Sequence, residues 1–142
     1  MPKLKIVLLV TAMAGFGTKI WAEQFLPYSD QTRVQNGRGL YQEYCATCHG
    51  TDLRGQENWR ERDAQGMLPA PPHDETGHTW HHADLLLFQI TKFGSSAVVG
   101  GGYQSNMPGF ADQLADAEIL DVLAFIKSTW PQRVIEVQNS RN

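Results

Sequence analysis

The sequence predicts a single small domain built only from α-helices. Three segments place apolar residues at the spacings of three and four that one face of a helix requires, and no stretch of useful length alternates apolar and polar residues as a strand would. The chain has 142 residues, the length of one domain rather than two, and it contains no internal repeat. We therefore expect about three main helices joined by long irregular loops.

Residues 1–22 have the pattern of an export signal. Lys3 and Lys5 precede an apolar run over residues 6–16, and the segment ends on a small residue. The apolar run is shorter than the ~20 residues that a membrane-spanning helix needs. We expect cleavage to release residues 23–142 into the periplasm as the mature domain, without a membrane span. Retention of the leader as an N-terminal anchor is the alternative.

Charge and cysteine content narrow the choice of partners. Loss of the leader removes three lysines and no acidic residue, so nine basic and fifteen acidic residues remain and the net charge is −6. A chain with this negative charge is not expected to bind nucleic acid or anionic lipid. It is expected to bind a partner protein that has a basic docking patch. The only cysteines, Cys45 and Cys48, would ordinarily form a disulfide in an oxidising compartment. Their spacing favours a different use.

The first two predicted helices flank a long irregular segment. The first runs from residue 31 to about 46, and the second runs from residue 81 or 82 to 93, where Gly94 ends it. Residues 50–78 lack periodicity and are rich in glycine, proline and charge. Because so long an irregular stretch is unusual inside a compact domain, we expect it to wrap one edge of a bound group.

The third predicted helix runs from Asp112 or Asp116 to Trp130, with acidic residues favouring its first turn and a proline ending it. Residues 94–106 are rich in glycine but lack the lysine and the serine or threonine of a phosphate-binding loop. We expect this stretch to be a flexible strap. Residues 132–142 are polar, and we expect them to fray.

Residues 45–49 read Cys-Ala-Thr-Cys-His, the spacing that attaches a haem covalently. The two thiols add to the vinyl groups on one edge of the porphyrin, and the adjacent histidine is then carried beneath the ring to ligate the iron. A structural zinc completed by one of the later histidines is a rival, but about thirty residues separate Cys48 from His78, far more than in common zinc modules. We expect one haem c, attached through Cys45 and Cys48, with His49 as an iron ligand.

Met107 is the ligand that we expect on the opposite face of the iron. Iron in a haem takes four ring nitrogens and two axial ligands. Met107 lies far downstream and precedes Pro108, which fixes the backbone before the last helix. A soft thioether favours ferrous iron and so raises the reduction potential. The alternatives are Met67 in the irregular segment, a histidine ligand, or a Met107 that only fills space in the core.

Four further histidines crowd one part of the chain: His73, His78, His81 and His82. On a helix, His78 and His82 would share one face. A neighbouring aspartate, Asp74 or Asp84, could then complete a copper or zinc site. The same histidines could instead hydrogen-bond the backbone or the haem propionates, or one of them could ligate the iron.

The chain resembles a class I c-type cytochrome over nearly all of the mature sequence. Members carry Cys-x-x-Cys-His after a first helix, here residues 45–49, and a Met-Pro pair before a last helix, here Met107 and Pro108. They also cross the first and last helices at a glycine and an aromatic residue, eight and four positions before the first cysteine. The matching residues are Gly37 and Tyr41 in the first helix and Val122 and Phe125 in the last.

Two features depart from the usual pattern of this family. Many relatives have Gly-Pro-x-Leu soon after the haem motif, and the carbonyl of that proline accepts a hydrogen bond from the histidine. Here the nearest match is Leu-Pro-Ala-Pro over residues 68–71, which suggests Pro69 for this role. A histidine- and tryptophan-rich insert over residues 59–82 resembles an elaboration of the haem edge.

The resemblance implies a cytochrome c fold wrapped around one covalent haem, and a monomeric carrier of single electrons between redox partner proteins. If His49 and Met107 fill both axial positions, oxygen and peroxide have no place to bind, so we do not expect an enzyme. Two alternatives stay open. In one, a displaceable sixth ligand and an acid or base among His78, His81 and His82 make a peroxidase or oxidase. In the other, the same histidines bind copper.

Overall fold

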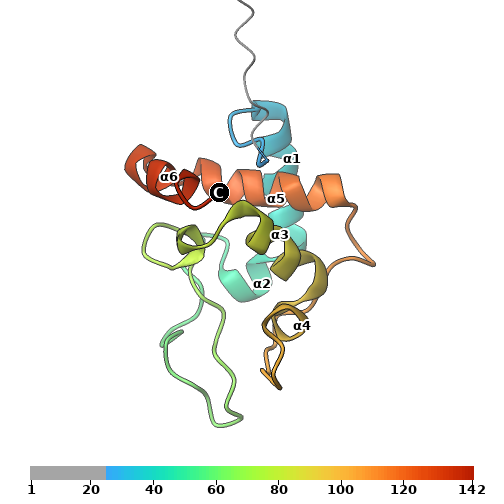
Figure 1. The fold of residues 1–142 in the computed structure, drawn as a ribbon, viewed down its shortest axis with the longest axis vertical. Coiled ribbons are helices and arrows are strands. Elements are labelled where there is room, and N and C mark those ends of the chain that lie inside the picture. Colours follow the sequence, from blue (N-terminus) through green and yellow to red (C-terminus); the bar gives the residue numbers. More distant parts are fainter. Residues whose placement is uncertain (1–24) are drawn as a thin grey trace, which may run out of the picture.

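The computed structural model describes residues 25–142, and the expected export signal lies outside them. Within this range the chain forms six α-helices and one short 3₁₀ helix, and no strand (Figure 1). The predicted all-α class is therefore confirmed. The elements are α1 (Gln31–Tyr44), α2 (Ala46–His49), η1 (Thr79–His81), α3 (Asp84–Phe93), α4 (Ser95–Val99), α5 (Asp116–Ser128) and α6 (Gln132–Asn139). None of the helices in residues 25–142 combines the length and apolar character needed to cross a membrane.

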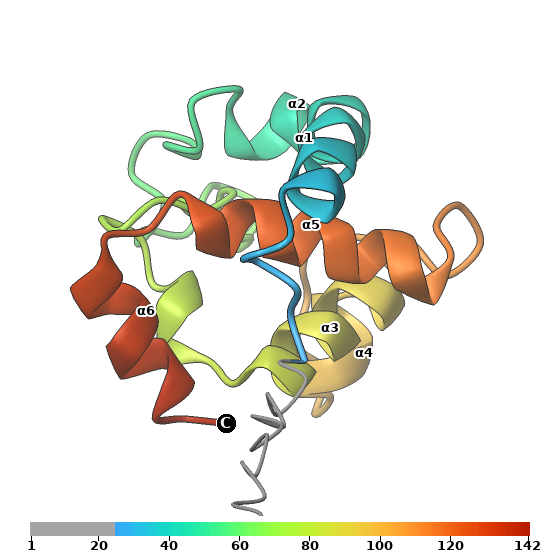
Figure 2. The same cartoon turned by 90° about the horizontal axis from the view of Figure 1, so that it is seen from above.

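The two longest helices, α1 and α5, cross each other (Figure 2). At the crossing, a Cβ atom added to Gly37 would stand 1.8 Å from the carbonyl oxygen of Asp121, so only glycine fits there. The ring of Tyr41 packs against that of Phe125 with a centroid distance of 5.4 Å. The predicted crossing of the first and last helices at these residues is confirmed.

Polar contacts hold the N-terminal half of α1 in place. Asp30 caps the helix by accepting hydrogen bonds from the backbone N–H groups of Thr32 and Arg33, at 2.9 and 3.2 Å. Asp121 of α5 pairs with Arg33 and accepts a hydrogen bond of 2.7 Å from Asn36 Nδ2. The Asp121 side chain is only 8% exposed. These partners therefore replace the hydrogen bonds to water that the carboxylate loses on burial.

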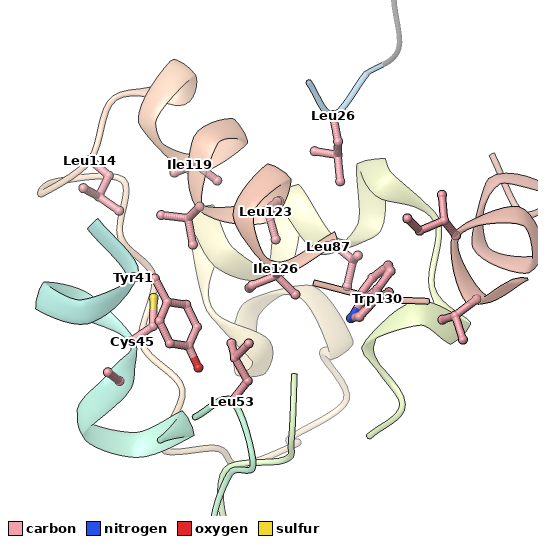
Figure 3. Close-up of a cluster of buried hydrophobic side chains, with 14 residues drawn as sticks. Leu26, Tyr41, Cys45, Leu53, Leu87, Leu114, Ile119, Leu123, Ile126 and Trp130 are labelled. Atoms are coloured by element: carbon pink, nitrogen blue, oxygen red, sulfur yellow. The ribbon is translucent and has the colours of Figure 1, made fainter. Parts of the chain in front are cut away.

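The hydrophobic core collects side chains from several helices and from the chain before α1 (Figure 3). The central stripe comes from α5, where apolar residues recur at helical spacing. Its members within residues 25–142 include Leu26, Tyr41, Leu87, Ile119, Leu123, Ile126 and Trp130. The crossing of α1 and α5 and the start of α3 are therefore parts of one core.

A buried polar cluster fastens α3 to α5 and α6. Asp84, the first residue of α3, is 3% exposed and lies 3.2 Å from Nζ of Lys127, which is 1% exposed. Gln138 Nε2 and Asn142 Nδ2 also donate to the Asp84 carboxylate, at 2.5 and 3.0 Å. A buried ion pair is tolerated only when further hydrogen bonds satisfy its remaining atoms, and here the C-terminal segment supplies them.

The expectation of a frayed C-terminal tail is wrong, because residues 132–139 form helix α6. Val134, Ile135 and Gln138 recur at spacings of one, three and four and are buried. They form a narrow face that packs beside η1 (Figure 2). A short helix with few apolar residues is stabilised by this packing rather than by its own propensity.

The glycine-rich stretch after α3 also differs in part from expectation. Gly94 ends α3 as predicted, with a backbone φ of +85° that favours glycine. The chain then forms the short helix α4 before it reaches three consecutive glycines, Gly100 to Gly102. The strap is therefore confined to the residues between α4 and α5.

The irregular segment over residues 50–78 contains turns but no regular helix or strand, as expected. Its middle part extends away from the helices as a long excursion (Figure 1). Two hydrogen bonds close the base of this excursion. Gln56 N donates to Ala70 O, and Ala70 N donates to the side chain of Gln56, each at 2.8 Å.

Candidate haem-binding site

The Cys-x-x-Cys-His motif forms its own short helix directly after α1. Cys45 N donates to Tyr41 O and His49 N donates to Cys45 O, both at 2.9 Å, so the motif continues the hydrogen-bonding pattern of α1 around a corner. Gly50, with φ of +80°, ends α2. The two thiols thus lie on one turn of helix beside His49.

Both cysteines are free thiols in different surroundings, Cys45 being buried and Cys48 exposed. Burial, together with the nearby Cys48, raises the pKa of the Cys45 thiol to about 12. Reactive disulfide-exchange cysteines have a lowered thiol pKa. The environment of Cys45 therefore argues against a thioredoxin-like redox pair.

His49 is buried and its ring is held in one orientation. Its Nδ1 lies 2.9 Å from the carbonyl oxygen of Pro71. A carbonyl can only accept, so Nδ1 carries the proton and donates, which leaves the Nε2 lone pair for a metal. Burial lowers the pKa of His49 and the Pro71 bond opposes this shift in part. The neutral imidazole that a metal requires is therefore the favoured form.

Tyr41 hydrogen-bonds the backbone at the end of α2. Its hydroxyl donates to Gly50 O at 3.1 Å and, at a longer distance of 3.4 Å, to His49 O. Burial is the main reason that the pKa of Tyr41 is raised, so its hydroxyl stays protonated and remains a donor. The same residue therefore packs the helix crossing and anchors the carbonyl end of the motif.

His73 stacks directly on His49, which the sequence did not indicate. The two ring centroids lie 3.8 Å apart and the rings are inclined by only 17°. The Nδ1 atom of His73 is shielded from solvent and has no hydrogen-bond partner among residues 25–142. A haem must fit between two axial ligands, so a ring stacked on His49 cannot be the ligand on the opposite face.

Met107 lies on the strap, partly buried, and the backbone around it is fastened to the end of α3. Phe110 N donates to Thr91 O at 3.0 Å and Ala111 N donates to Lys92 O at 3.1 Å. Met107 N donates to Ser105 Oγ at 3.1 Å. Met67, the alternative ligand, lies in the excursion of residues 50–78, where its N–H bonds Asp63 at 2.8 Å.

Comparison with protein families gives one match, to the cytochrome c model, over residues 34–130. The chain belongs to the cytochrome c family. Comparison with curated proteins and with solved structures gave no match. Membership implies a covalently bound haem c and haem-based electron transfer.

The residues of this cytochrome fit such a group. Two free thiols stand on one turn of helix, and the adjacent imidazole is neutral with its Nδ1 already engaged. This is the donor set that covalent attachment and axial ligation require.

The structure corrects the expected partner of His49 in this cytochrome. Pro71 accepts the hydrogen bond, not Pro69. The family pattern Gly-Pro-x-Leu is thus represented by residues 70–73, which read Ala-Pro-Pro-His. The signal was present in the sequence, but the missing glycine and the histidine in place of leucine concealed it.

The other histidines of the insert are held by aromatic contacts rather than gathered around a metal. His78 stacks on Trp59 with a centroid distance of 5.3 Å, and its ring meets that of His82 edge-on at 5.4 Å. His81 stacks on Trp80 at 3.7 Å. Among residues 25–142 no three His, Cys, Asp or Glu side chains come together in a way that could hold a metal ion. This gives the copper and zinc alternatives no support.

Proposed function

We propose that this cytochrome is an exported one-electron carrier with a single haem, attached through Cys45 and Cys48, and with His49 and Met107 as axial ligands. The observation that carries the proposal is the His49 to Pro71 hydrogen bond beside the two free thiols. This bond fixes the tautomer and leaves Nε2 as the ligating atom.

Each side chain has a distinct part in this role. The haem supplies iron that gains and loses one electron. Hydrogen bonding from Nδ1 to Pro71 makes the His49 imidazole a stronger electron donor, and the Met107 thioether favours the ferrous state. The packed crossing of α1 and α5 keeps the His49 side rigid, so little rearrangement accompanies electron transfer.

We also propose that the protein works as a monomer in the periplasm and meets its redox partners through a small, weak surface. A mature net charge of −6 favours partners with a basic docking patch. Weak docking suits rapid exchange of single electrons. No contact in residues 25–142 favours the peroxidase alternative, since His78 and His81 are packed against tryptophans.

The axial ligand is tested by optical spectroscopy of the purified holoprotein and two methionine variants. We expect a low-spin haem with a methionine-to-iron charge-transfer band, unreactive to carbon monoxide. Met107→Ala should abolish the band and lower the reduction potential, and Met67→Ala should leave both unchanged. Loss of the band in Met67→Ala alone would refute the assignment. A high-spin wild-type protein that binds carbon monoxide would favour the enzyme alternative.

Export is tested by the mass of the protein purified from a periplasmic extract. We expect a chain that begins at residue 23 and carries the mass of one haem. A full-length chain found in the membrane fraction would instead favour the N-terminal anchor.

A further inference from the structure

We propose that His73 is a positioning residue that fixes the plane of the His49 imidazole. The proposal rests on the proposed role of His49 as an axial ligand and assigns no iron bond to His73. The two rings are nearly parallel at a centroid distance of 3.8 Å, so the face of one lies against the face of the other. Rotation of the His49 ring out of its plane would collide with His73.

The hydrogen bond to Pro71 alone does not fix this plane. It restrains the position of Nδ1, but hydrogen bonds tolerate donor angles down to roughly 120° before they weaken steeply. The imidazole could therefore swing about its Cβ–Cγ bond while it kept the Pro71 contact. Contact with a flat ring on one face removes that freedom. Pro71 thus restrains the edge of the His49 ring, and His73 restrains its face.

His73 is itself held from several sides. Its backbone N–H donates to Leu53 O at 2.7 Å, and its carbonyl accepts from Trp130 Nε1 at 2.7 Å. Its ring also meets that of Tyr41 at a centroid distance of 5.8 Å. Leu53, which supplies the carbonyl, has a φ of +68°, a conformation that costs energy for a leucine. The strained turn aims the Leu53 carbonyl at His73, as expected where a site is over-determined by its surroundings.

The link between Pro71 and His73 is stiff. Pro71 and Pro72 both have a ring-fixed φ, so few free backbone torsions separate the acceptor of the His49 bond from the stacking ring. Two glycines lie tightly against this segment. A Cβ atom on Gly77 would stand 2.0 Å from Pro72 O, and one on Gly55 would stand 2.5 Å from Ala70 O. Residues 70–73 therefore form a clamp on His49.

Packing alone does not account for a histidine at this position. An aliphatic side chain of similar size would fill the space without leaving a shielded nitrogen unpaired by residues 25–142, and an unpaired polar atom is costly. What histidine offers over an aliphatic residue is a flat ring. The orientation of an axial imidazole decides which iron d orbitals it overlaps, and hence how unpaired spin spreads over the porphyrin. Fixing the plane therefore fixes an electronic property of the haem.

The test is proton NMR of the ferric holoprotein, in which unpaired spin shifts the haem methyl resonances. We expect His73→Leu to change the order or spread of these resonances, because the His49 ring is freed. His73→Phe retains a flat ring and should keep the wild-type pattern. His81→Leu is the matched control, since His81 stacks on Trp80 rather than on His49. A wild-type pattern in His73→Leu, or equal changes in all three variants, would overturn the proposal.

A measurement on the wild-type protein covers the case in which the variants fail to fold or to bind haem. In the diamagnetic ferrous state, the ring protons of His49 and His73 should show nuclear Overhauser effects to each other, and their absence would overturn the proposal. Failure of the proposed function is read separately from the wild-type optical spectrum. A spectrum without low-spin histidine–methionine ligation would remove both proposals, whereas a normal spectrum with unchanged variants would remove only this one.

Discussion

The two proposed axial ligands are supported in different ways. His49 is buried at the end of α2, bonded to Pro71, stacked on His73 and backed by the crossing of α1 and α5. Met107 is partly buried on a strap that bonds the end of α3 through backbone groups and enters the core further along, through Phe110 and Leu114. The histidine ligand is therefore itself surrounded by buried contacts, whereas the methionine ligand is held through neighbouring residues of the strap.

This difference suggests different roles for the His49 side and the Met107 side of the haem. A rigid histidine side keeps the haem and its attachment in one geometry while the iron changes charge. A strap can be displaced at lower cost, because local openings draw on the least packed segments. α3 links the strap to α5, since its first residue, Asp84, pairs with the buried Lys127 of α5 and its last turn carries the strap.

The largest effect should come from breaking the histidine side at Gly37. Gly37→Val places a side chain where even a Cβ atom would stand 1.8 Å from Asp121 O, and it should cost about 3 kcal/mol of unfolding free energy, the upper end of the usual range for overpacking. Denaturant unfolding of the holoprotein measures the loss. Gly39→Ala is the matched control in the same helix, because no atom of residues 25–142 outside that turn of helix lies within 4 Å of the added Cβ. It should stabilise the protein by about 0.5–1 kcal/mol, and an equal loss in both variants would contradict the close crossing.

A second large effect should come from the buried ion pair that anchors α3. Asp84→Asn leaves Lys127 with an uncompensated charge in a site that is 1% exposed, and it should cost about 3 kcal/mol or more. Asp116→Asn is the control, because its partner Lys92 lies 2.6 Å away in an exposed pair. Such a pair is worth at most about 1 kcal/mol. If Asp84→Asn also weakens the methionine-to-iron band, the buried ion pair helps to hold the strap in place through α3. Equal and small losses of unfolding free energy in both variants would contradict this role of the ion pair.

The helices and the haem-attachment motif were largely predictable because their signals are local. Periodicity located α1 and α5, the spacing of Cys45, Cys48 and His49 located the motif, and Gly94 marked the end of α3. Each signal lies within a few residues of the feature that it predicts. The glycine of the helix crossing was found through a family resemblance, since nothing nearby in the sequence shows what α5 brings to Gly37.

Contacts made by the irregular segment could not be read in the same way. Pro71 and His73 reach His49 because Leu53, Gly55 and Trp130 hold them there, and none of these contacts leaves a periodic trace. Helix α6 is a different case. Its buried positions recur at helical spacing in the sequence, but its low apolar content and the preceding proline suggested an ending rather than a new start.

A moderate effect should appear when the strap is shifted without touching the histidine side. A Cβ atom on Gly109 would stand 2.6 Å from the backbone carbon of Phe93, so Gly109→Ala must push the strap away from α3. We expect about tenfold weaker binding of Met107 to iron, which corresponds to about 1.4 kcal/mol. The readouts are a weaker charge-transfer band and new reactivity to carbon monoxide. Ser105→Ala, which removes only the 3.1 Å bond from Met107 N, should have a smaller effect in the same direction.

The smallest predicted effect is a loss of stability in mild acid near the start of α3. Burial, followed by the neighbouring histidines, lowers the pKa of both His78 and His82 from the ordinary value of 6.5. The folded protein therefore binds fewer protons at these groups than the unfolded chain, so the stability they contribute is present above pH 6.5 and is lost as pH falls below it. His82 precedes α3, and its carbonyl accepts a bond of 3.1 Å from Gln138 Nε2, so the loss should loosen the anchoring of α3 before it reaches the core. Thermal unfolding between about pH 7 and pH 5.5 should decline less steeply in the double variant His78→Gln, His82→Gln. Both groups are only partly shielded, so the difference should be small, but identical slopes would show that acid acts elsewhere.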